Sequence, residues 1–197
     1  MVNGCGIILL AAGPSTRLGK PKQLLQHNGK SLLKNSMEEA LNANADSVMV
    51  VLGAHSNLLY GEIDKNKVQL VVNTEWEEGM ASSIRIGLKS LLKLIPSVET
   101  VIFIVCDQPH LSASLLNELL ITHQKTGKPI VASNYGEAIG PPALFHKSFF
   151  SELMQLKGDT GAKKIIQQHS SEIATVSFPE GQIDIDSPAD YEALQKY

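Results

Sequence analysis

Apolar residues in this chain gather into short runs that alternate with segments of helical periodicity. The runs are six to eight residues long and almost continuously hydrophobic, and the last of them is the weakest: 6–12, 47–53, 68–73, 100–107, 128–133 and 172–178. Runs of this length and composition are typical of strands buried on both faces, as in a parallel sheet between two layers of helices.

Between these runs, apolar positions recur every three or four residues, as on one face of a helix. The clearest case lies between Met80 and Ile95, and further helices are predicted over 31–43, 112–124 and 161–169. A last helix is expected to start at Ser187–Asp190, where a capping Ser is followed by Pro at the first helical position and an acidic residue at the third.

Strands that alternate with helices predict a doubly wound α/β fold with a mostly parallel sheet. The chain has 197 residues, 43% of them hydrophobic and 19% charged, which is typical of a soluble globular protein. No internal repeat, low-complexity tract or linker interrupts the sequence. We therefore expect one domain over residues 1–197.

Charge and cysteine content exclude several classes of protein. The net charge of -3 argues against a nucleic-acid binder, and no basic run marks a membrane surface. The apolar stretch 7–12 is too short to span a bilayer, which needs roughly 20 residues. The two cysteines, Cys5 and Cys106, form neither a CxxC pair nor a disulfide framework, so a cytoplasmic location is expected.

A glycine- and lysine-rich turn follows the first predicted strand. It is not a P-loop, because Gly13 and Gly19 are one residue too far apart and Pro21 replaces the metal-binding Ser or Thr. Nor does it contain the G-x-G-x-x-G dinucleotide motif. It still offers groups suited to an anion, which are Gly13, Ser15, Thr16, Arg17, Lys20 and Lys22. A solvated basic loop is an equal alternative.

Asp107 ends the most apolar of the predicted strands. An unpaired carboxylate in a partly dry crevice is costly, and a Mg²⁺ ion held by one or two carboxylates and substrate phosphates would offset that cost. The alternative is that Asp107 caps the following helix. A second ligand is available from Asp184 or Asp186, which share one face of an extended segment, whereas Asp190 is better explained as a helix cap.

Six motifs taken together resemble one family. "LAAGPSTRLGKPKQLL", "EGMASSIRIGL", "CDQPHLS", "GPPALF", "GDTGAKKI" and "DIDSPADY" occur in the order found in the molybdenum cofactor cytidylyltransferases, which are MobA-like nucleotidyltransferases. The resemblance runs through nearly the whole chain. It implies a Rossmann-like three-layer α/β/α fold.

The resemblance also assigns roles to residues. The first motif looks like the segment that wraps an NTP triphosphate, with contacts from Leu10, Ala11, Ala12, Gly13, Ser15, Arg17 and Lys22, whereas Lys20 falls on a variable position of the motif. The double Ala resembles the cytidylyl branch. The second motif implies pyrimidine contacts from Gly79, Ser82 and Ser83. Asp107 and Asp186 would bind Mg²⁺, and the loops "IGPPALF" and "KGDTGAK" would face the acceptor through Gly140, Pro141, Asp159 and Gly161.

The implied reaction is transfer of CMP from CTP to a phosphorylated acceptor, molybdopterin or molybdenum cofactor, with release of pyrophosphate. Arg17, Lys22 and Asp107 would be the catalytic residues, and a molybdoenzyme is a possible partner for the product. Two alternatives remain at this point. One is a related transferase that acts on a sugar or alcohol phosphate with another NTP, and the other is a non-catalytic chaperone that binds a nucleotide or pterin.

Overall fold

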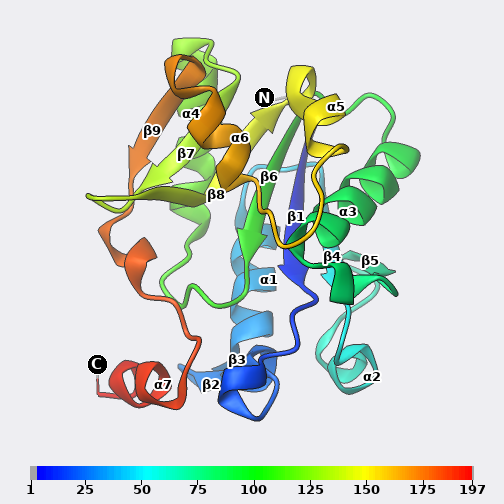
Figure 1. The fold of residues 1–197 in the computed structure, drawn as a ribbon, viewed down its shortest axis with the longest axis vertical. Coiled ribbons are helices and arrows are strands. Elements are labelled where there is room, and N and C mark those ends of the chain that lie inside the picture. Colours follow the sequence, from blue (N-terminus) through cyan, green and yellow to red (C-terminus); the bar gives the residue numbers. More distant parts are fainter. Residues whose placement is uncertain (1–3, 197) are drawn as a thin grey trace.

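The computed structural model describes residues 4–196, which form one large sheet covered by helices on both faces (Figure 1). The seven strands of this sheet lie in the order β5-β4-β1-β6-β8-β7-β9. Their bounds are β1 (Cys5–Ala11), β4 (Ser47–Leu52), β5 (Gln69–Val72), β6 (Thr100–Val105), β7 (Ile130–Asn134), β8 (Ile139–His146) and β9 (Ile173–Ser177). A small separate ladder pairs β2 (Gln26–His27) with β3 (Lys30–Ser31).

Seven α-helices accompany the strands in the described part of the chain: α1 (Leu32–Asn42), α2 (Ser56–Leu59), α3 (Met80–Leu94), α4 (Ala113–Thr126), α5 (Phe150–Leu153), α6 (Lys163–Gln168) and α7 (Pro188–Leu194). None of the helices within residues 4–196 has the length and apolar character needed to cross a bilayer. All of the predicted helices are present, with bounds shifted by one or two residues, and α2 and α5 are additional short helices.

Two apolar cores explain the three layers. Consecutive residues of β1 point to opposite faces of the sheet, so that Ile7 and Leu9 pack with α1 and α4 while Ile8 packs with α3 and α6. All three side chains are fully buried. This double burial is the reason that the strand sequences are hydrophobic at almost every position, and the predicted α/β fold with a mostly parallel sheet is confirmed.

One strand was missed by the sequence analysis, which took "IGPPALF" as a loop. These residues lie in β8, which runs antiparallel between β6 and β7. Pro141 and Pro142 lie opposite the point where the register with β7 shifts between Ala132 and Ser133, and β6 pairs with β8 only from Ala143 onward. The two prolines thus sit in a bulge where no ladder hydrogen bond is lost, which is one of the few places where a strand accepts proline.

The predicted start of the last helix is confirmed by its cap. The Ser187 hydroxyl accepts a hydrogen bond from the backbone N–H of Asp190, and the Asp190 carboxylate accepts one from the backbone N–H of Ser187. A third, smaller core then attaches this end of the chain to the turn after β1. It contains Leu18, Leu25, Leu32, Ile185 and Leu194.

The topology brings two loops to one edge of the sheet. Leu10 near the end of β1 is paired in register with Val105 at the end of β6, so the segments that follow these strands emerge side by side. A cleft at the carboxyl ends of parallel strands is where open α/β sheets bind ligands. The small core described above adds the segment that leads into α7 to this same edge (Figure 1).

Candidate active site

The turn after β1 is held in shape by its own neighbours. Ser15 adopts a left-handed backbone conformation at φ 54°, and a short 3-10 helix over Thr16–Leu18 follows it. The Ser15 hydroxyl accepts a hydrogen bond of 3.0 Å from the backbone N–H of Lys22. The Gln23 amide, which is 1% exposed, donates to the carbonyls of Ala11 at 3.0 Å and Gly13 at 3.1 Å. The turn is therefore fixed before any ligand arrives.

Gly13 has no packing reason to be glycine. A Cβ atom added there would meet no protein atom within 4 Å, and its backbone does not require a positive φ. The contrast with Gly53 is clear, since a Cβ there would lie 2.6 Å from the carbonyl oxygen of Ala12. The open space above Gly13 is what close approach of a ligand to the backbone needs.

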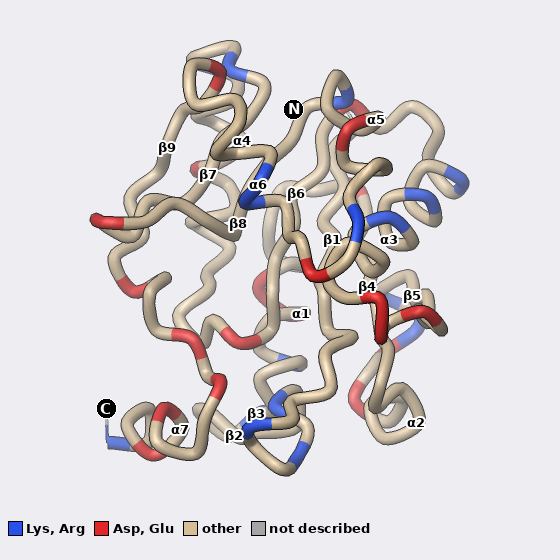
Figure 2. Tube along the Cα trace, viewed as in Figure 1, with Lys and Arg blue, Asp and Glu red and all other residues tan. Residues whose placement is uncertain are grey.

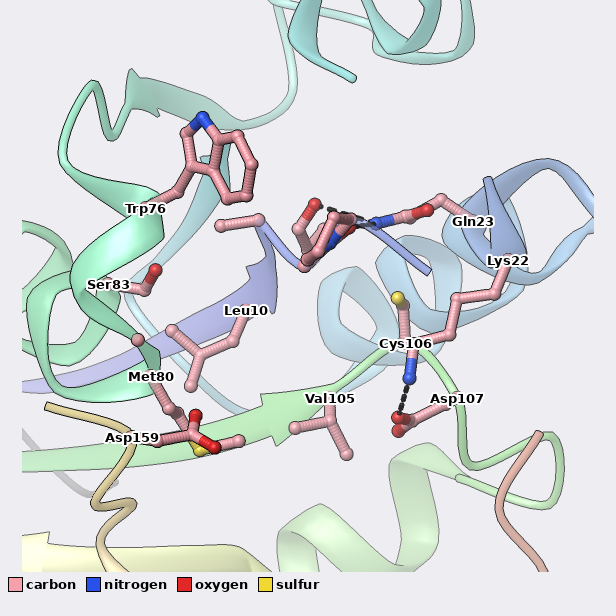
Figure 3. Close-up of a pocket in the computed structure, with 15 residues that line it drawn as sticks. Leu10, Lys22, Gln23, Trp76, Met80, Ser83, Val105, Cys106, Asp107 and Asp159 are labelled. Carbon is pink, nitrogen blue, oxygen red and sulfur yellow. Dashed lines mark hydrogen bonds and ion pairs between the residues drawn. The ribbon is translucent and has the colours of Figure 1, made fainter. Parts of the chain in front are cut away.

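Lys22 joins two carboxylates that are distant in sequence. Its ammonium nitrogen lies 2.5 Å from Asp107 Oδ2 and 2.9 Å from Asp186 Oδ1, and the Asp107 contact is drawn in Figure 3. Arg17 contacts the other oxygen of Asp186 at 2.7 Å. The side chains of Lys22 and Asp107 are only 16% and 18% exposed, whereas that of Arg17 is 71% exposed. In the tube view, acidic positions mark the segment leading into α7 and basic positions the turn before β2 (Figure 2).

These contacts set the charges of the cluster. Burial alone would lower the pKa of Lys22, but the charge of Asp107 and the hydrogen bonds to both carboxylates raise it above its ordinary value. Burial alone would raise the pKa of Asp186, but Lys22 and Arg17 hold it below its usual range. Asp184 differs, because burial and the nearby charges of Asp186 and Asp107 raise its pKa. The cluster therefore keeps Lys22 charged and Asp186 ionised.

The alternative role for Asp107 as a helix cap is wrong. Helix α4 begins at Ala113 and is capped by Ser112, whose hydroxyl accepts a hydrogen bond from the backbone N–H of Leu115. Among residues 4–196, no group of three or more His, Cys, Asp or Glu side chains is arranged to hold a metal ion. Asp107 and Asp186 both contact the ammonium group of Lys22, and their carboxylate oxygens are of the kind that binds Mg²⁺ together with phosphate oxygens.

The opposite side of the cleft is formed by the start of α3. Gly79 precedes this helix with φ 111°, and a Cβ there would lie 2.6 Å from the backbone of Asp159. The backbone N–H of Ala81 donates to the carbonyl of Gly158 at 3.1 Å. In Figure 3, Trp76, Met80, Ser83 and Asp159 face Lys22 and Asp107 across the cavity. The "KGDTGAK" segment is thus docked on the helix that carries the predicted base contacts.

The predicted base contacts have different surroundings. Ser83 lines the cavity, and its hydroxyl accepts a hydrogen bond of 3.0 Å from the side-chain amide of Asn73. The Ser82 hydroxyl accepts from the same amide at 2.7 Å and donates to the carbonyl of Gly79 at 2.8 Å. Ser82 does not line the cavity, so its position supports a structural role at the helix start.

The cleft consists of three connected parts. The inner cavity of about 170 Å³ is lined by Leu10, Ala11, Ala12, Gly13 and Ser83, among others. A wider cleft of about 800 Å³ extends past Arg17, Asp107, Asp184 and Asp186. An apolar recess of about 270 Å³ opens beside Met80 and is lined by Leu10, Ile84, Phe103, Gly161 and Ile166.

The four predicted acceptor contacts are not equally placed. Pro141 and Asp159 line the wide cleft, and Gly161 lines the apolar recess, where a Cβ would lie 2.7 Å from the sulfur of Met80. Gly140 is buried beneath Tyr135, since a Cβ there would lie 2.8 Å from the phenol oxygen. Gly140 therefore shapes the wall of the cleft from behind.

Gln108 was missed by the sequence analysis. Its side chain is 4% exposed, and its amide nitrogen lies 3.0 Å from the Tyr135 hydroxyl, 3.1 Å from the carbonyl of Pro141 and 3.0 Å from that of Gly181. Tyr135 itself donates a hydrogen bond to the carbonyl of Pro141. Gln108 thus joins the strand end at Asp107 to β8 and to the segment that carries Asp184. Gln23 was missed too. Both glutamines lie inside motifs quoted above, but the sequence does not show that they are buried or which carbonyl groups they contact.

Comparison with known proteins places the chain in a family. Residues 7–173 match the model of the MobA-like NTP transferase domain. Purine catabolism protein PucB from Bacillus subtilis is 26% identical over 199 residues, which cover 96% of this chain and 95% of PucB. Nicotine blue oxidoreductase from Paenarthrobacter nicotinovorans is 32% identical over 118 residues, 59% of this chain, and the match spans only 56% of that protein.

Solved structures share the fold. Rv0371c from Mycobacterium tuberculosis H37Rv superposes with a TM-score of 0.85 at 24% identity over all of both chains, and it has also been solved in complex with manganese. Molybdopterin-guanine dinucleotide biosynthesis protein A from Archaeoglobus fulgidus superposes with a TM-score of 0.69 at 15% identity over 97% of both chains. At these identities the likeness establishes the fold.

Proposed function

The chain belongs to the MobA-like NTP transferase family, and from this premise we propose that it transfers CMP from CTP to a phosphorylated acceptor of the molybdopterin type. One observation carries the proposal. Lys22, on the turn after β1, meets Asp107 and Asp186 at the head of a cavity above the open backbone of Gly13. A phosphate loop, a lysine and two carboxylates in one cleft are what phosphoryl transfer needs for positioning and charge stabilisation.

In this reaction an oxygen of the acceptor phosphate forms a bond to the α-phosphorus of the nucleotide. The bond between the α-phosphorus and the bridging oxygen to the β-phosphate breaks, and its electron pair leaves with pyrophosphate. No proton has to be removed, because a phosphate is already ionised at neutral pH. The cleft accordingly needs no nucleophilic side chain, and the buried Cys106 thiol, whose pKa burial raises to about 12, is unsuited to that role.

The residues of the cleft would have different roles in this reaction. Backbone groups around Gly13 and Ser15 would hold the triphosphate, and Arg17 and Lys22 would neutralise the charge that develops on the α-phosphate and on pyrophosphate. Asp107 and Asp186 would hold a divalent cation, Mg²⁺ or Mn²⁺. Such an ion supplies further neutralisation of phosphate oxygens when it is bound.

Two features support the choice of substrates, one in the cleft and one in the sequence. The apolar recess beside Met80 offers a surface for a flat ring system, whereas a sugar phosphate would leave its apolar lining without a partner. The double Ala at 11–12 resembles the cytidylyl branch of the family, and this resemblance supports CTP as the nucleotide.

The proposal is tested by pyrophosphate release with each of the four NTPs in the presence of Mg²⁺ or Mn²⁺. Each nucleotide is assayed alone, with a molybdopterin-type acceptor and with a set of sugar and alcohol phosphates. We expect release that requires both CTP and the pterin acceptor. Release with another NTP or with a sugar phosphate would transfer the assignment to a related transferase, and binding of CTP without turnover in any mixture would favour a chaperone.

Two variants control the assay. Asp107→Asn removes a proposed metal ligand at nearly constant volume and is expected to be inactive, so residual release in that sample measures contaminating enzymes. Lys20→Met is expected to be fully active, because the Lys20 ammonium lies over the ring of Tyr191, and the ion pairs of Asp107 and Asp186 within residues 4–196 are with Lys22 and Arg17.

A further inference from the structure

We propose that Lys22 occupies the position of the divalent cation in the free enzyme and leaves it for the phosphates of the nucleotide. The metal would then bind together with the nucleotide and not before it. This inference rests on the proposed function, because it takes Asp107 and Asp186 as the metal ligands. It adds an order of binding that the assignment of ligands does not contain.

The first argument is the position of the ammonium group. It lies between the two carboxylates, 2.5 Å from Asp107 and 2.9 Å from Asp186, which is the space that a cation shared by these two residues would occupy. A divalent cation and an ammonium group cannot share that position, since two positive charges a few ångströms apart repel strongly in a half-buried site. Binding of the metal therefore requires that Lys22 move.

The second argument is that Lys22 has no other acidic partner. Its ion pairs within residues 4–196 are those with Asp107 and Asp186. Moving its charged group out of a site where it is only 16% exposed is costly unless another anion receives it. The triphosphate of the nucleotide is such an anion, whereas a metal ion arriving alone brings none.

The third argument is the attachment of the lysine backbone. The backbone N–H of Lys22 is held by the Ser15 hydroxyl at 3.0 Å, and Gln23 fixes the same turn to the end of β1. The stem of Lys22 thus starts from the proposed phosphate loop in either state. Only rotation of its side chain is needed to exchange the carboxylates for phosphate oxygens, without rearrangement of the fold.

Arg17 does not fill this position. Its ion pair within residues 4–196 is with Asp186, through the oxygen that Lys22 does not use, and its side chain is 71% exposed. An exposed ion pair of this kind contributes little. Arg17 therefore serves as a matched comparison, since its removal takes one positive charge from the same carboxylate without vacating the space between Asp107 and Asp186.

The experiment is a titration with Mn²⁺ in which free metal is followed by electron paramagnetic resonance, in the absence of nucleotide. It compares the wild type with Lys22→Met, Arg17→Met and Lys20→Met, after circular dichroism and thermal unfolding have shown that each variant is folded. Lys22→Met is expected to bind Mn²⁺ at least about tenfold more tightly than the wild type, because no buried ion pair must be broken. Arg17→Met should gain much less, and Lys20→Met should match the wild type.

Two further measurements locate the effect. Adding Asp107→Asn to Lys22→Met should abolish the gain in Mn²⁺ affinity, and Mn²⁺ should raise the melting temperature of Lys22→Met but barely that of the wild type. Equal Mn²⁺ affinity in the wild type and Lys22→Met would overturn the inference, as would an equal gain in Lys20→Met, which would reveal only a general effect of charge.

Failure of the proposed function looks different. If neither the wild type nor Lys22→Met binds Mn²⁺, even with the non-hydrolysable analogue α,β-methylene-CTP, then Asp107 and Asp186 are not metal ligands, and the inference falls with that assignment. If the wild type binds Mn²⁺ tightly without nucleotide and Asp107→Asn abolishes this binding, the ligands are right and the inference alone is wrong.

Discussion

The two sides of the cleft are built in different ways. On the phosphate side, the turn after β1 is fixed by residues within a dozen positions of one another, through Gln23 and the Ser15 hydroxyl. On the acceptor side, Gln108 holds together three segments that lie 27, 33 and 73 residues away in sequence. The backbone of the phosphate side is thus held largely by local contacts, with support from the small core that joins Leu18 and Leu25 to Leu194, whereas the acceptor side depends on segments that are distant in sequence.

This difference separates what the two sides can specify. A turn stabilised by its own contacts presents the same backbone groups in any protein that contains it, so it suits a group common to all nucleotides. A wall assembled from distant segments changes when any of those segments changes, so it suits a substrate that must be recognised specifically, as we propose for the acceptor. Lys22 and Arg17 connect the two sides, since both reach Asp186 from the phosphate side.

The strongest way to break the phosphate side is Lys22→Ala. We expect turnover to fall by about 10²–10³-fold, the typical cost of losing one group that stabilises charge in the transition state. The fall should appear in kcat measured by pyrophosphate release at saturating nucleotide. Wild-type activity in this variant would remove Lys22 from the mechanism, and Lys20→Ala provides the control for loss of charge.

A paired experiment separates the two sides. Gln23→Leu removes the donor to the carbonyls of Ala11 and Gly13, and leaving such groups unsatisfied costs about 1–3 kcal/mol each. We expect weaker nucleotide binding by calorimetry, by roughly tenfold or more, with little change in KM for the acceptor.

Gln108→Leu is the counterpart on the acceptor side. It releases the link between Tyr135, Pro141 and Gly181, so KM for the acceptor should rise while calorimetric nucleotide affinity stays near that of the wild type. If both leucine variants changed the same constant, the division of the cleft into two sides would be wrong.

A smaller change sharpens the account of the phosphate side. Gly13→Ala adds a methyl group where no protein atom lies within 4 Å, so the free energy of unfolding should change by less than about 0.5 kcal/mol. Nucleotide affinity should nevertheless fall, because the methyl group stands where the ligand approaches. Gly79→Ala gives the opposite pattern, since its Cβ meets the backbone of Asp159 at 2.6 Å and its φ is 111°, so it should destabilise the fold. Chemical denaturation of both variants checks the contrast.

The same difference explains what was readable from the sequence. Helix α3 and strands β1 and β6 were predicted because the apolar residues that each of them buries form a regular pattern within one stretch of sequence. Strand β8 was missed, because Pro141 and Pro142 in its bulge imitate a loop. At the site, the turn after β1 and Asp107 can each be recognised from the residues next to them in sequence. The contact between Lys22 and Asp186 joins residues 164 positions apart, so it follows only from the fold.

The roles of the buried glutamines are harder still to recognise from the sequence. Gln23 and Gln108 are polar residues whose roles depend on carbonyl groups that only the folded chain brings near them. No periodicity or spacing marks such residues. The catalytic and binding roles of the site residues stay predictions that the variants above test.

The smallest expected effect concerns Tyr135, which lines the wide cleft on the acceptor side. Burial, with the charges of Asp107 and Asp184, raises the pKa of its phenol to about 12, although the hydrogen bond from Gln108 opposes the rise. Because this pKa is raised above that of the unfolded chain, about 10, the neutral phenol contributes stability below pH 10 that is lost as the pH rises toward 12. The chain has four tyrosines, so absorbance at alkaline pH should show one that ionises late. Tyr135→Phe should remove that late phase alone; if the phase remains, another tyrosine produces it, and the packing of the acceptor side around Gln108 is looser than its contacts indicate.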